Sequence, residues 1–375
     1  MPLYHSAASL LSFIPTVQSG STQALGRKFS TRTFWPEVRA TNASIIQYVG
    51  ETLRYLVAAP SELDAAGNSL DKAHRVRAAF GNGLRPDVWN KFKERFGIDT
   101  IVEFYAATEG TLGSWNVSRN NHGAGAIGRS GWILRALVGH NLAIVRVDWD
   151  TEQPYRDPVT GNCEMVEPNQ PGELLFKLPA EDLKKRFQGY YNNPDATASK
   201  IMRDVFVKGD AWFRTGDLVR GNDGLMYFND RLGDTFRWKS ENVSTAEVSE
   251  AVGLHPNVTE ANVYGVELPH HDGRAGCVAI SFDKKPEQST LKSLATHVRK
   301  SLPKYAVPLF LRVIPEVGSG QLTGTNKQQK HHLRKAGVKP GALADGSELF
   351  WLKDDEYVPF RQRDWSELEG GRVKL

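Results

Sequence analysis

Hydrophobic and polar positions in the first third of the chain follow patterns typical of alternating helices and strands. A glycine turn at residues 81–83 precedes a helix-like stretch that begins at Pro86 and stops at Gly97. The apolar run at 101–105 then predicts a short buried strand that leads into a polar loop. This alternation predicts an α/β fold for residues 1–122.

The pattern changes near residue 123, where short strand-like runs begin to lie between turn signals. These runs predict a small β-rich subdomain over residues 123–229. They occupy residues 142–147, 173–178 and 225–228.

Helical patterning returns after Arg231. Ser244 and Glu247 have the spacing of a capping box, so a helix should begin there and end at Gly253. We therefore place a domain boundary after residue 229 and predict a compact α+β domain over 230–375, with a tail extension from about residue 341. Its other predicted elements are strands at 261–266, 277–282 and 309–314 and a helix at 291–301.

Composition fits a folded, multidomain protein. Of the 375 residues, 40% are hydrophobic and 24% are charged, which excludes a largely disordered chain. The 47 basic and 43 acidic residues leave a net charge of +4, too small to indicate nucleic-acid binding. Cys163 and Cys277 are the only cysteines, so a disulfide framework and a four-cysteine metal site are excluded.

Targeting signals give a mixed picture. No uncharged apolar run reaches the length of about 18 residues that a transmembrane helix needs, so none is predicted. The first 15 residues lack a basic start, which argues against a signal peptide. Residues 373–375 approximate the Ser-Lys-Leu peroxisomal address and are either that address or an uninformative tail. We expect an intracellular protein, with the peroxisome or a membrane surface as candidate locations.

The strongest local motif is FYAATEG, residues 104–110. It follows a predicted strand, and ligands commonly bind at the ends of strands in α/β sheets. Tyr105 could stack on a flat ring, Thr108 offers a hydroxyl to a phosphate, and Glu109 offers a carboxylate to Mg²⁺. The alternative is an ordinary loop with a cap-like Thr-Glu pair.

The second motif spans residues 212–231. Asp217 follows a glycine, so we expect a turn that presents its carboxylate, which suits the two hydroxyls of a ribose. Arg231 follows the next predicted strand and could pair with a phosphate or ribose oxygen. Residues 222–224 form a hairpin signal. Taken alone, this motif is better explained as a hairpin with solvated charges.

Three further groups of residues each have a functional and a purely structural interpretation. Residues 233–248 begin with basic and aromatic side chains, but the cluster is too short to favour nucleic-acid binding. Lys327 lies in a polar loop, where a lysine is usually exposed to solvent. The cluster at 270–272, His-His-Asp, is better explained as an exposed turn than as a metal site.

Together, and in this order, the motifs resemble those of the adenylate-forming acyl-CoA synthetases. Within that superfamily the chain is similar to the very-long-chain acyl-CoA synthetase and fatty acid transport protein branch. The resemblance covers nearly the whole chain. It implies a partial large N-terminal domain, residues 1–229, followed by a small mobile C-terminal domain, residues 230–375. The strings that carry it are PLYHSA, KFSTRTFW, QYVGETLRYL, GNGLRPDVW, FYAATEG, FNDRLGDTFRWKSENVSTAEV, VYGVELPHHDGRAG and LTGTNKQQK.

The resemblance implies a role for each matching residue. Thr108, Glu109 and Lys327 would be catalytic, with Thr108 at the α-phosphate, Glu109 at Mg²⁺ and Lys327 at the carboxylate and phosphate. Gly233 would be the hinge, and His5 and Ser240 would lie along the acyl and coenzyme A channel. The nucleotide-binding residues would be Gly81, Asn82, Gly83, Tyr105, Thr108, Asp217 and Arg231.

The implied reaction has two steps. A fatty carboxylate attacks the α-phosphate of ATP to give an acyl-adenylate and pyrophosphate, and the thiol of coenzyme A then displaces AMP. Mg²⁺ would stabilise charge on the phosphate oxygens. The implied partners are a fatty acid or other carboxylic acid and, as a possibility, a membrane surface, with no nucleic acid.

Two departures from the family modify these expectations. The family's phosphate-binding loop precedes the PLYHS string, whereas only Met1 precedes it here, so we expect weak or absent adenylation by this chain alone. Ser240 stands where the family usually has glycine beside the pantetheine channel. Two alternatives therefore stay open: an impaired protein that binds AMP or an acyl-adenylate, and a CoA ligase for another bulky acid.

Overall fold

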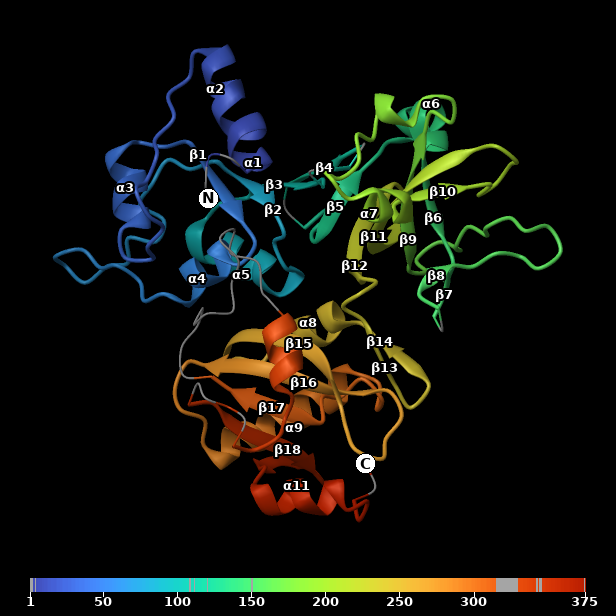
Figure 1. The fold of residues 1–375 in the computed structure, drawn as a ribbon. Helices are drawn as coiled ribbons and strands as arrows, with labels where there is room; N and C mark the ends of the chain where they lie inside the picture. The colour runs from blue at the N-terminus through green and yellow to red at the C-terminus, as the bar shows by residue number, and fades with distance from the viewer. Residues whose placement is uncertain are drawn as a thin grey trace. The chain divides into compact units, whose positions relative to one another are not determined.

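The computed structural model describes residues 3, 5–107, 109–110, 112–119, 121–149, 151–314, 330–341, 343, 346–373 and 375. The chain divides into two compact units, Met1–Leu232 and Gly233–Leu375 (Figure 1). Each unit contains its own buried hydrophobic clusters. Within the described residues, every helix is too short or too polar to traverse a bilayer.

The first unit begins with an α/β part built on a four-stranded sheet. The order is β1 (Ile45–Val49), β2 (Ala78–Asn82), β3 (Thr100–Tyr105) and β4 (Ser114–Arg119). The first three strands are parallel, and β4 is antiparallel to β3. The predicted strand at 101–105 is therefore confirmed as β3.

Helices pack against this sheet with their apolar sides. In α5 (Pro86–Phe96), Trp89, Phe92 and Phe96 are buried, and Gly97 ends the helix with a left-handed φ of 67°, as the sequence predicts. The same cluster includes side chains of α3 and α4. The helices of this part are α1 (Ser6–Ala8), η1 (Ser9–Phe13), α2 (Ile14–Ser19), α3 (Phe34–Ala40), α4 (Thr52–Ala58) and α5.

The β-rich part of the first unit is an antiparallel sheet of six strands. Its order is β5 (Ala126–Arg129), β12 (Leu225–Arg231), β11 (Ala211–Asn222), β9 (Gly172–Leu178) and β6 (Leu142–Val145), with β10 (Ile201–Arg203) also paired to β11. The turn between β11 and β12 has positive φ at Asp223 and Gly224, which matches the predicted hairpin. The remaining elements are α6 (Trp132–Val138), η2 (Gly139–Asn141), β7 (Val147–Asp148), β8 (Gln153–Pro154), η3 (Leu183–Lys185) and α7 (Pro194–Ser199).

The single strand predicted at 142–147 is wrong in its extent. It divides into β6 and β7 at Arg146. The Arg146 amide donates to the Glu164 carbonyl at 2.8 Å, and the Arg146 carbonyl accepts from the Tyr155 amide at 2.8 Å. The backbone at Arg146 therefore bonds to residues outside the ladder that pairs β6 with β9.

The second unit is an α+β fold around a five-stranded sheet. Its order is β15 (Val258–Glu267), β16 (Arg274–Phe282), β17 (Phe310–Val313), β18 (Glu348–Lys353) and β19 (Glu356–Pro359). β16 and β17 are parallel, and α9 (Gln288–Ser301) connects them. The other elements are β13 (Phe236–Trp238), β14 (Glu241–Val243), α8 (Thr245–Gly253), α10 (His331–Ala336) and α11 (Gln362–Glu369).

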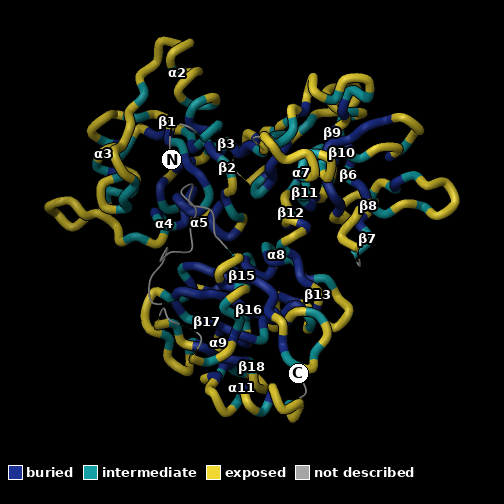
Figure 2. The backbone as a smooth tube through the Cα atoms, in the orientation of Figure 1, coloured by how far each residue is buried: buried dark blue, intermediate teal, exposed yellow. Residues whose placement is uncertain are grey.

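Local signals predicted α8 well. The Ser244 hydroxyl accepts from the Glu247 amide at 3.2 Å, and the helix ends at Gly253. The segment that the sequence suggested as a tail extension supplies β18, β19 and α11, and its buried side chains belong to the main cluster of this unit. Tyr357 is fully buried there and donates to the Pro308 carbonyl at 2.9 Å. Buried backbone follows the sheets of both units, whereas α2 and α6 are largely exposed (Figure 2).

Candidate active site

Asp217 lies at a bulge inside a continuous strand, which corrects the prediction of a turn. The pairing of β11 with β9 shifts between Arg214 and Leu218. Gly216, within this irregular stretch, has a φ of 75°, a conformation that glycine adopts without a Cβ penalty. The glycine before Asp217 therefore has the conformational role expected of it, but in a bulge.

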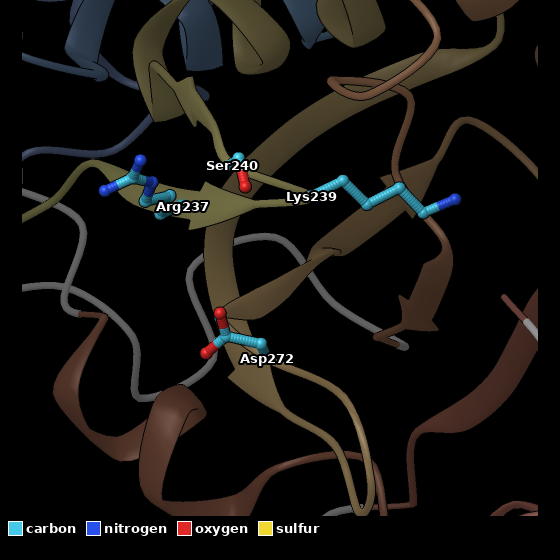
Figure 3. A pocket seen from close by; sticks show the side chains of 5 residues that line it. Arg237, Lys239, Ser240 and Asp272 are labelled. Carbon is cyan, nitrogen blue, oxygen red and sulfur yellow. The ribbon is translucent and has the colours of Figure 1, made fainter.

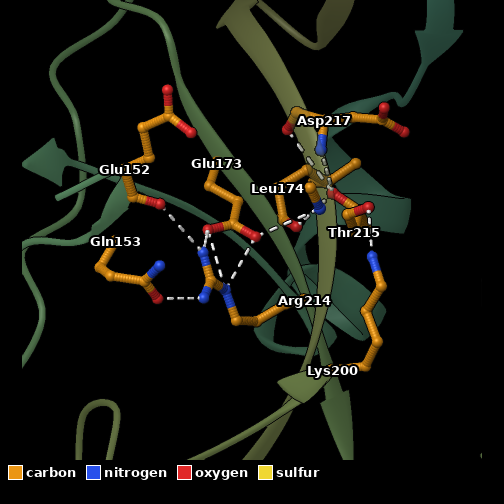
Figure 4. Close-up of polar contacts among 9 residues, drawn as sticks. Glu152, Gln153, Glu173, Leu174, Lys200, Arg214, Thr215 and Asp217 are labelled. Atoms are coloured by element: carbon orange, nitrogen blue, oxygen red, sulfur yellow. Dashed lines mark hydrogen bonds and ion pairs between the residues drawn. The ribbon is translucent and has the colours of Figure 1, made fainter. Parts of the chain in front are cut away.

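A polar network holds this bulge in place (Figure 4). The fully buried Glu173 carboxylate pairs with Arg214 at 2.7 Å and accepts from the Gly216 amide at 3.2 Å. The Thr215 hydroxyl donates to the Leu174 carbonyl at 2.7 Å and accepts from the Asp217 amide at 3.0 Å. The sequence analysis missed Glu173, although a carboxylate beside the apolar run Leu174–Phe176 is a signal of a buried, paired charge.

Tyr105 and Arg231 converge on Asp217 from separate strands. The Tyr105 hydroxyl, at the end of β3, donates to Asp217 Oδ2 at 2.6 Å. Arg231 Nε lies 3.5 Å from Asp217 Oδ1, and the Arg231 side chain is 59% exposed. Burial and the Asp217 charge raise the pKa of Tyr105, so its hydroxyl stays a neutral donor. The structure thus brings three predicted nucleotide-binding residues together.

The predicted adenine-contacting segment, residues 81–83, runs from the end of β2 into a tight turn. Gly81 pairs with Tyr48 on β1, and a Cβ on Gly81 would lie 2.2 Å from the Tyr48 carbonyl oxygen. Gly83 has a φ of 80°. Asn82 Oδ1 is buried and has no hydrogen-bond partner among the described residues, so it is an acceptor that suits the amino group of a purine.

We expect Gly81→Ala to destabilise the first unit by about 1–3 kcal/mol, because the new methyl group must push β1 away from β2. Gly131→Ala is the matched control, since a Cβ there meets nothing within 4 Å. Urea denaturation of both variants measures the difference. Equal stability of the two would contradict the close approach of β1 and β2 at Gly81.

Glu103 is a second residue that the sequence analysis missed. It is 1% exposed on β3, inside the sheet. Its Oε1 accepts from the Gly83 amide at 2.5 Å and the Leu84 amide at 3.2 Å, and its Oε2 accepts from the Tyr48 hydroxyl. Burial raises the pKa of Glu103 to about 8, although these donors lower it. Glu103 therefore ties the turn at Gly83 to β1 and β3.

Glu109 contacts the β-rich part of the same unit. It accepts a hydrogen bond from the Tyr190 hydroxyl at 3.0 Å. Burial, together with Glu109, raises the pKa of Tyr190. A partly exposed carboxylate of this kind is a hard oxygen ligand that fits Mg²⁺. Thr108 and Lys327 lie outside the described residues.

The backbone conformation at position 240 accounts for the glycine that the family usually has there. Lys239 and Ser240 form the two-residue turn between β13 and β14, with φ of 52° and 66°. A type I′ turn needs positive φ at both positions, and a side chain is strained there. Ser240 lines a small cavity of about 310 Å³, and Figure 3 shows its side chain among those that line it. The cavity is lined by Arg237, Lys239, Ser240, Asp272 and Gly273.

The remaining predicted residues have local structural roles. The Gly233 carbonyl accepts from Arg334 at 3.0 Å, and a Cβ on Gly233 would meet nothing within 4 Å, so this conformation does not itself require glycine. His5 Nδ1 accepts from the Ala7 amide at 3.2 Å and caps α1. His5 and Asp217 lie in the first unit, whereas Gly233 and Ser240 lie in the second.

The sequence matches two parts of one enzyme family. Residues 1–191 match the AMP-binding enzyme family, and residues 247–324 match the AMP-binding enzyme C-terminal domain. Among curated relatives, isopenicillin N epimerase component 1 of Hapsidospora chrysogena is 44% identical over 99% of this chain and 61% of its own length. The very long-chain fatty acid transport protein of Cochliobolus heterostrophus is also 44% identical, over 100% of this chain and 57% of its own length.

A mammalian relative gives the same picture. Long-chain fatty acid transport protein 2 of Rattus norvegicus is 40% identical over 100% of this chain and 58% of its own length. The chain therefore spans about 60% of the length of the curated relatives named here.

Solved structures agree on the fold. ATP-bound MatB from Rhodopseudomonas palustris superposes with a TM-score of 0.65 at 19% identity, over 89% of this chain and 58% of that one. The o-succinylbenzoate CoA synthetase of Bacillus subtilis, in complex with its acyl-adenylate, gives 0.61 at 21% identity, over 89% and 59%. The predicted adenylate-forming fold is confirmed. The chain belongs to the AMP-binding enzyme family and, within it, is similar to the long- and very-long-chain fatty acid transport proteins.

Proposed function

We propose that this chain is the nucleotide-binding and C-terminal part of a ligase that activates a long- or very-long-chain fatty acid with ATP and transfers it to coenzyme A. The observation that carries the proposal is the convergence of Tyr105 and Arg231 on Asp217. Asp217 Oδ2 accepts from Tyr105 and Oδ1 lies beside Arg231, and a carboxylate with its two oxygens matches the two hydroxyls of a ribose. Trapping the acid as its CoA ester would also drive fatty acid uptake.

We assign the rest of the nucleotide site to the segment beside Asp217. Asn82 Oδ1, which has no partner in the part of the chain that the structure describes, would accept from adenine, next to the turn formed by Gly81 and Gly83. Tyr105 would supply the aromatic face. Thr108 would contact the α-phosphate, and Glu109 would hold Mg²⁺, which neutralises negative charge on phosphate oxygens when it is bound.

We assign to the second unit a role in both steps of the reaction. Lys327 would steady the carboxylate and phosphate during adenylation, and Gly233 would be the hinge for domain rotation. Ser240 would lie along the coenzyme A channel, and Arg237 and Lys239 support this because cations in the same cavity suit its phosphates. His5 would lie beside the acyl group. Association with a membrane surface, and a location in the peroxisome, also belong to this proposal.

A CoA ligase for a bulkier acid is the second candidate. It is favoured by one relative, 44% identical, whose name refers to isopenicillin N rather than to a fatty acid. The third possibility, binding of AMP or an acyl-adenylate without turnover, makes a separate prediction. A chain of that kind binds AMP and forms no CoA ester from ATP.

Titration of the chain with ATP and AMP by calorimetry tests the nucleotide site. We expect Asp217→Asn to weaken binding about 10- to 100-fold, because hydrogen bonds to a charged group contribute about 1.5–3 kcal/mol. Asp223→Asn is the matched control, since Asp223 is exposed in the turn after β11. If wild type binds neither nucleotide, or both variants bind equally, the assignment is wrong.

Product analysis then separates the candidates. The chain is incubated with ATP, coenzyme A and either palmitate, a very-long-chain acid or a bulky aromatic acid, and CoA esters are identified by mass spectrometry. Esters of the two fatty acids support the leading proposal, and an ester of the aromatic acid alone supports the second candidate. AMP binding without any ester, even when the pre-formed acyl-adenylate is supplied with coenzyme A, supports the third.

A further inference from the structure

Helix α6 exposes an unusual amount of apolar surface. Trp132 is 74% exposed, Leu137 67% and Ile133 57%, and Leu134 and Val138 are also exposed. No residue of this helix is buried. These five side chains lie within seven consecutive residues, so they extend around the helix instead of forming one stripe. A contiguous exposed apolar surface of this kind marks a site of interaction with another molecule or with a membrane.

The surroundings of α6 are basic. Residues 110–147 contain no aspartate or glutamate. Arg129 is exposed at the end of β5, just before the helix, and Arg135 is exposed within it. Arg135 also lies next to the turn that contains Asp223, since its Nη1 is 3.4 Å from the position of a Cβ on Gly224. The charged side chains of residues 110–147 are therefore all basic, and Asp223 lies in the turn next to Arg135.

The N-terminal helices provide an internal contrast. Leu10, Phe13, Ile14 and Val17 are 57%, 48%, 40% and 64% exposed in η1 and α2. Residues 6–26, however, contain no charged side chain. The two exposed apolar surfaces thus differ in charge, and α6 has cations both before and within its apolar residues.

This combination indicates what α6 contacts. A folded protein partner usually covers one face of a helix. Apolar side chains on several sides of a helix leave water together only in an environment that surrounds the helix. The upper part of a lipid bilayer is such an environment, and tryptophan is enriched at its interface. Arginines beside the inserted side chains would meet the phosphates of anionic lipids.

We propose that α6, with Arg129, Trp132, Ile133, Arg135 and Leu137, is a docking surface for an anionic lipid bilayer. The helix inserts its apolar side chains to the level of the headgroups, and the arginines remain among the phosphates. This places the β-rich part of the first unit at the membrane. The inference rests on the part of the proposed function that names a membrane surface, which it makes specific to α6 and to anionic lipid, and it does not depend on the ligase activity.

Vesicle flotation of the full chain tests the proposal. The vesicles contain either phosphatidylcholine alone or phosphatidylcholine with about 30% phosphatidylserine. We expect binding to the anionic vesicles, with affinity that falls when salt is raised from about 0.1 to about 0.5 M. The double variant Trp132→Ser/Leu137→Ser should lose at least about tenfold in affinity, because its apolar insertion is removed.

Charge variants and a matched apolar control complete the design. Arg129→Gln and Arg135→Gln should each weaken binding about fivefold and reduce its salt dependence. Leu10→Ser/Val17→Ser removes similar apolar surface without nearby charge and should bind like wild type. Circular dichroism and AMP titration confirm that each variant is folded.

Three outcomes would overturn the proposal. The first is equal binding to neutral and anionic vesicles. The second is a loss of binding in the Leu10→Ser/Val17→Ser variant that matches the loss in the α6 variant. The third is a lipid-free dimer that dissociates when Trp132 and Leu137 are replaced, which would make α6 an interface between copies of the chain. A chain that binds no AMP but docks through α6 contradicts only the proposed nucleotide function.

Discussion

Replacing Arg54 with leucine should destabilise the α/β part of the first unit by about 3–5 kcal/mol. Arg54 is 7% exposed on α4, and its guanidinium pairs with Asp87 at 2.7 and 2.9 Å and with Glu51 at 2.5 Å. Both carboxylates are buried, at 4% and 5% exposure. Removing the arginine leaves Asp87 without this bidentate partner. Arg85, whose Nε lies 2.9 Å from Glu51 Oε1, still compensates the charge of Glu51 but not that of Asp87.

The measurement is hydrogen exchange during urea denaturation, read at peptides from α4 and α5. It reports this part of the chain separately from the second unit. Arg39→Leu is the control, because its partner Glu62 is 46% exposed and surface ion pairs contribute about 0–1 kcal/mol. If Arg54→Leu costs no more than Arg39→Leu, the buried pair does not clamp α4 to α5.

Glu103→Leu should have an effect of similar size on stability and a second effect on the nucleotide site. The variant leaves the Gly83 amide, the Leu84 amide and the Tyr48 hydroxyl without an acceptor in the interior. At about 1–3 kcal/mol for each of these three unsatisfied donors, we expect a total loss of at least about 3 kcal/mol. The turn at Gly83 also loses its anchor, so the Kd for ATP should rise about tenfold. Glu103 acts here as a positioning residue, through the turn.

Glu103→Gln distinguishes positioning from a general loss of structure. The amide oxygen can still accept from Gly83, and its NH₂ group can donate to Tyr48, so we expect ATP affinity close to wild type. Rescue by glutamine together with loss in the leucine variant supports the positioning role. Equal nucleotide affinity in the leucine variant and wild type would exclude it.

The raised pKa of Glu103 also predicts how the free energy of unfolding depends on pH. Burial raises the pKa of Glu103 from 4.5 to about 8, so between these values the folded chain binds more protons at this site than the unfolded chain. The Glu103 contribution to the free energy of unfolding should therefore fall as pH rises from about 4.5 to about 8, and stay constant above that. Urea denaturation at several pH values should show this slope in wild type and a flatter curve in Glu103→Gln.

Local signals predicted elements well wherever neighbours in the sequence decide the structure. Pro86 and Gly97 bound α5, Ser244 caps α8, and the 222–224 signal forms a hairpin turn. Predictions were poorer where partners distant in the sequence decide. The run at 142–147 divides because Arg146 bonds to Glu164 and Tyr155. Within the segment expected to be a tail extension, residues 348–353 and 356–359 become strands of the sheet of the second unit, because β18 pairs with the edge of β17.

The candidate site divides in the same way. The motif order in the sequence was enough to identify the family and to name Tyr105, Asp217 and Arg231 as nucleotide-binding candidates. It did not reveal that Asp217 sits on a bulge held by Glu173 and Thr215, because that network joins residues about 40 positions apart. It also did not reveal Glu103, whose partners lie on β1 and in the turn after β2.

By itself, the sequence determined the family, the α/β and α+β parts of the chain and most of the residues proposed to bind the nucleotide, because these depend on residue types and their spacing. Only the tertiary structure decided which side chains meet. It placed Tyr105 and Arg231 on either side of one carboxylate, buried Glu103 beneath the turn at Gly83, and left the apolar side chains of α6 on the surface. Contact and burial are set by how strands and helices pack, and residue spacing along the chain does not encode them directly.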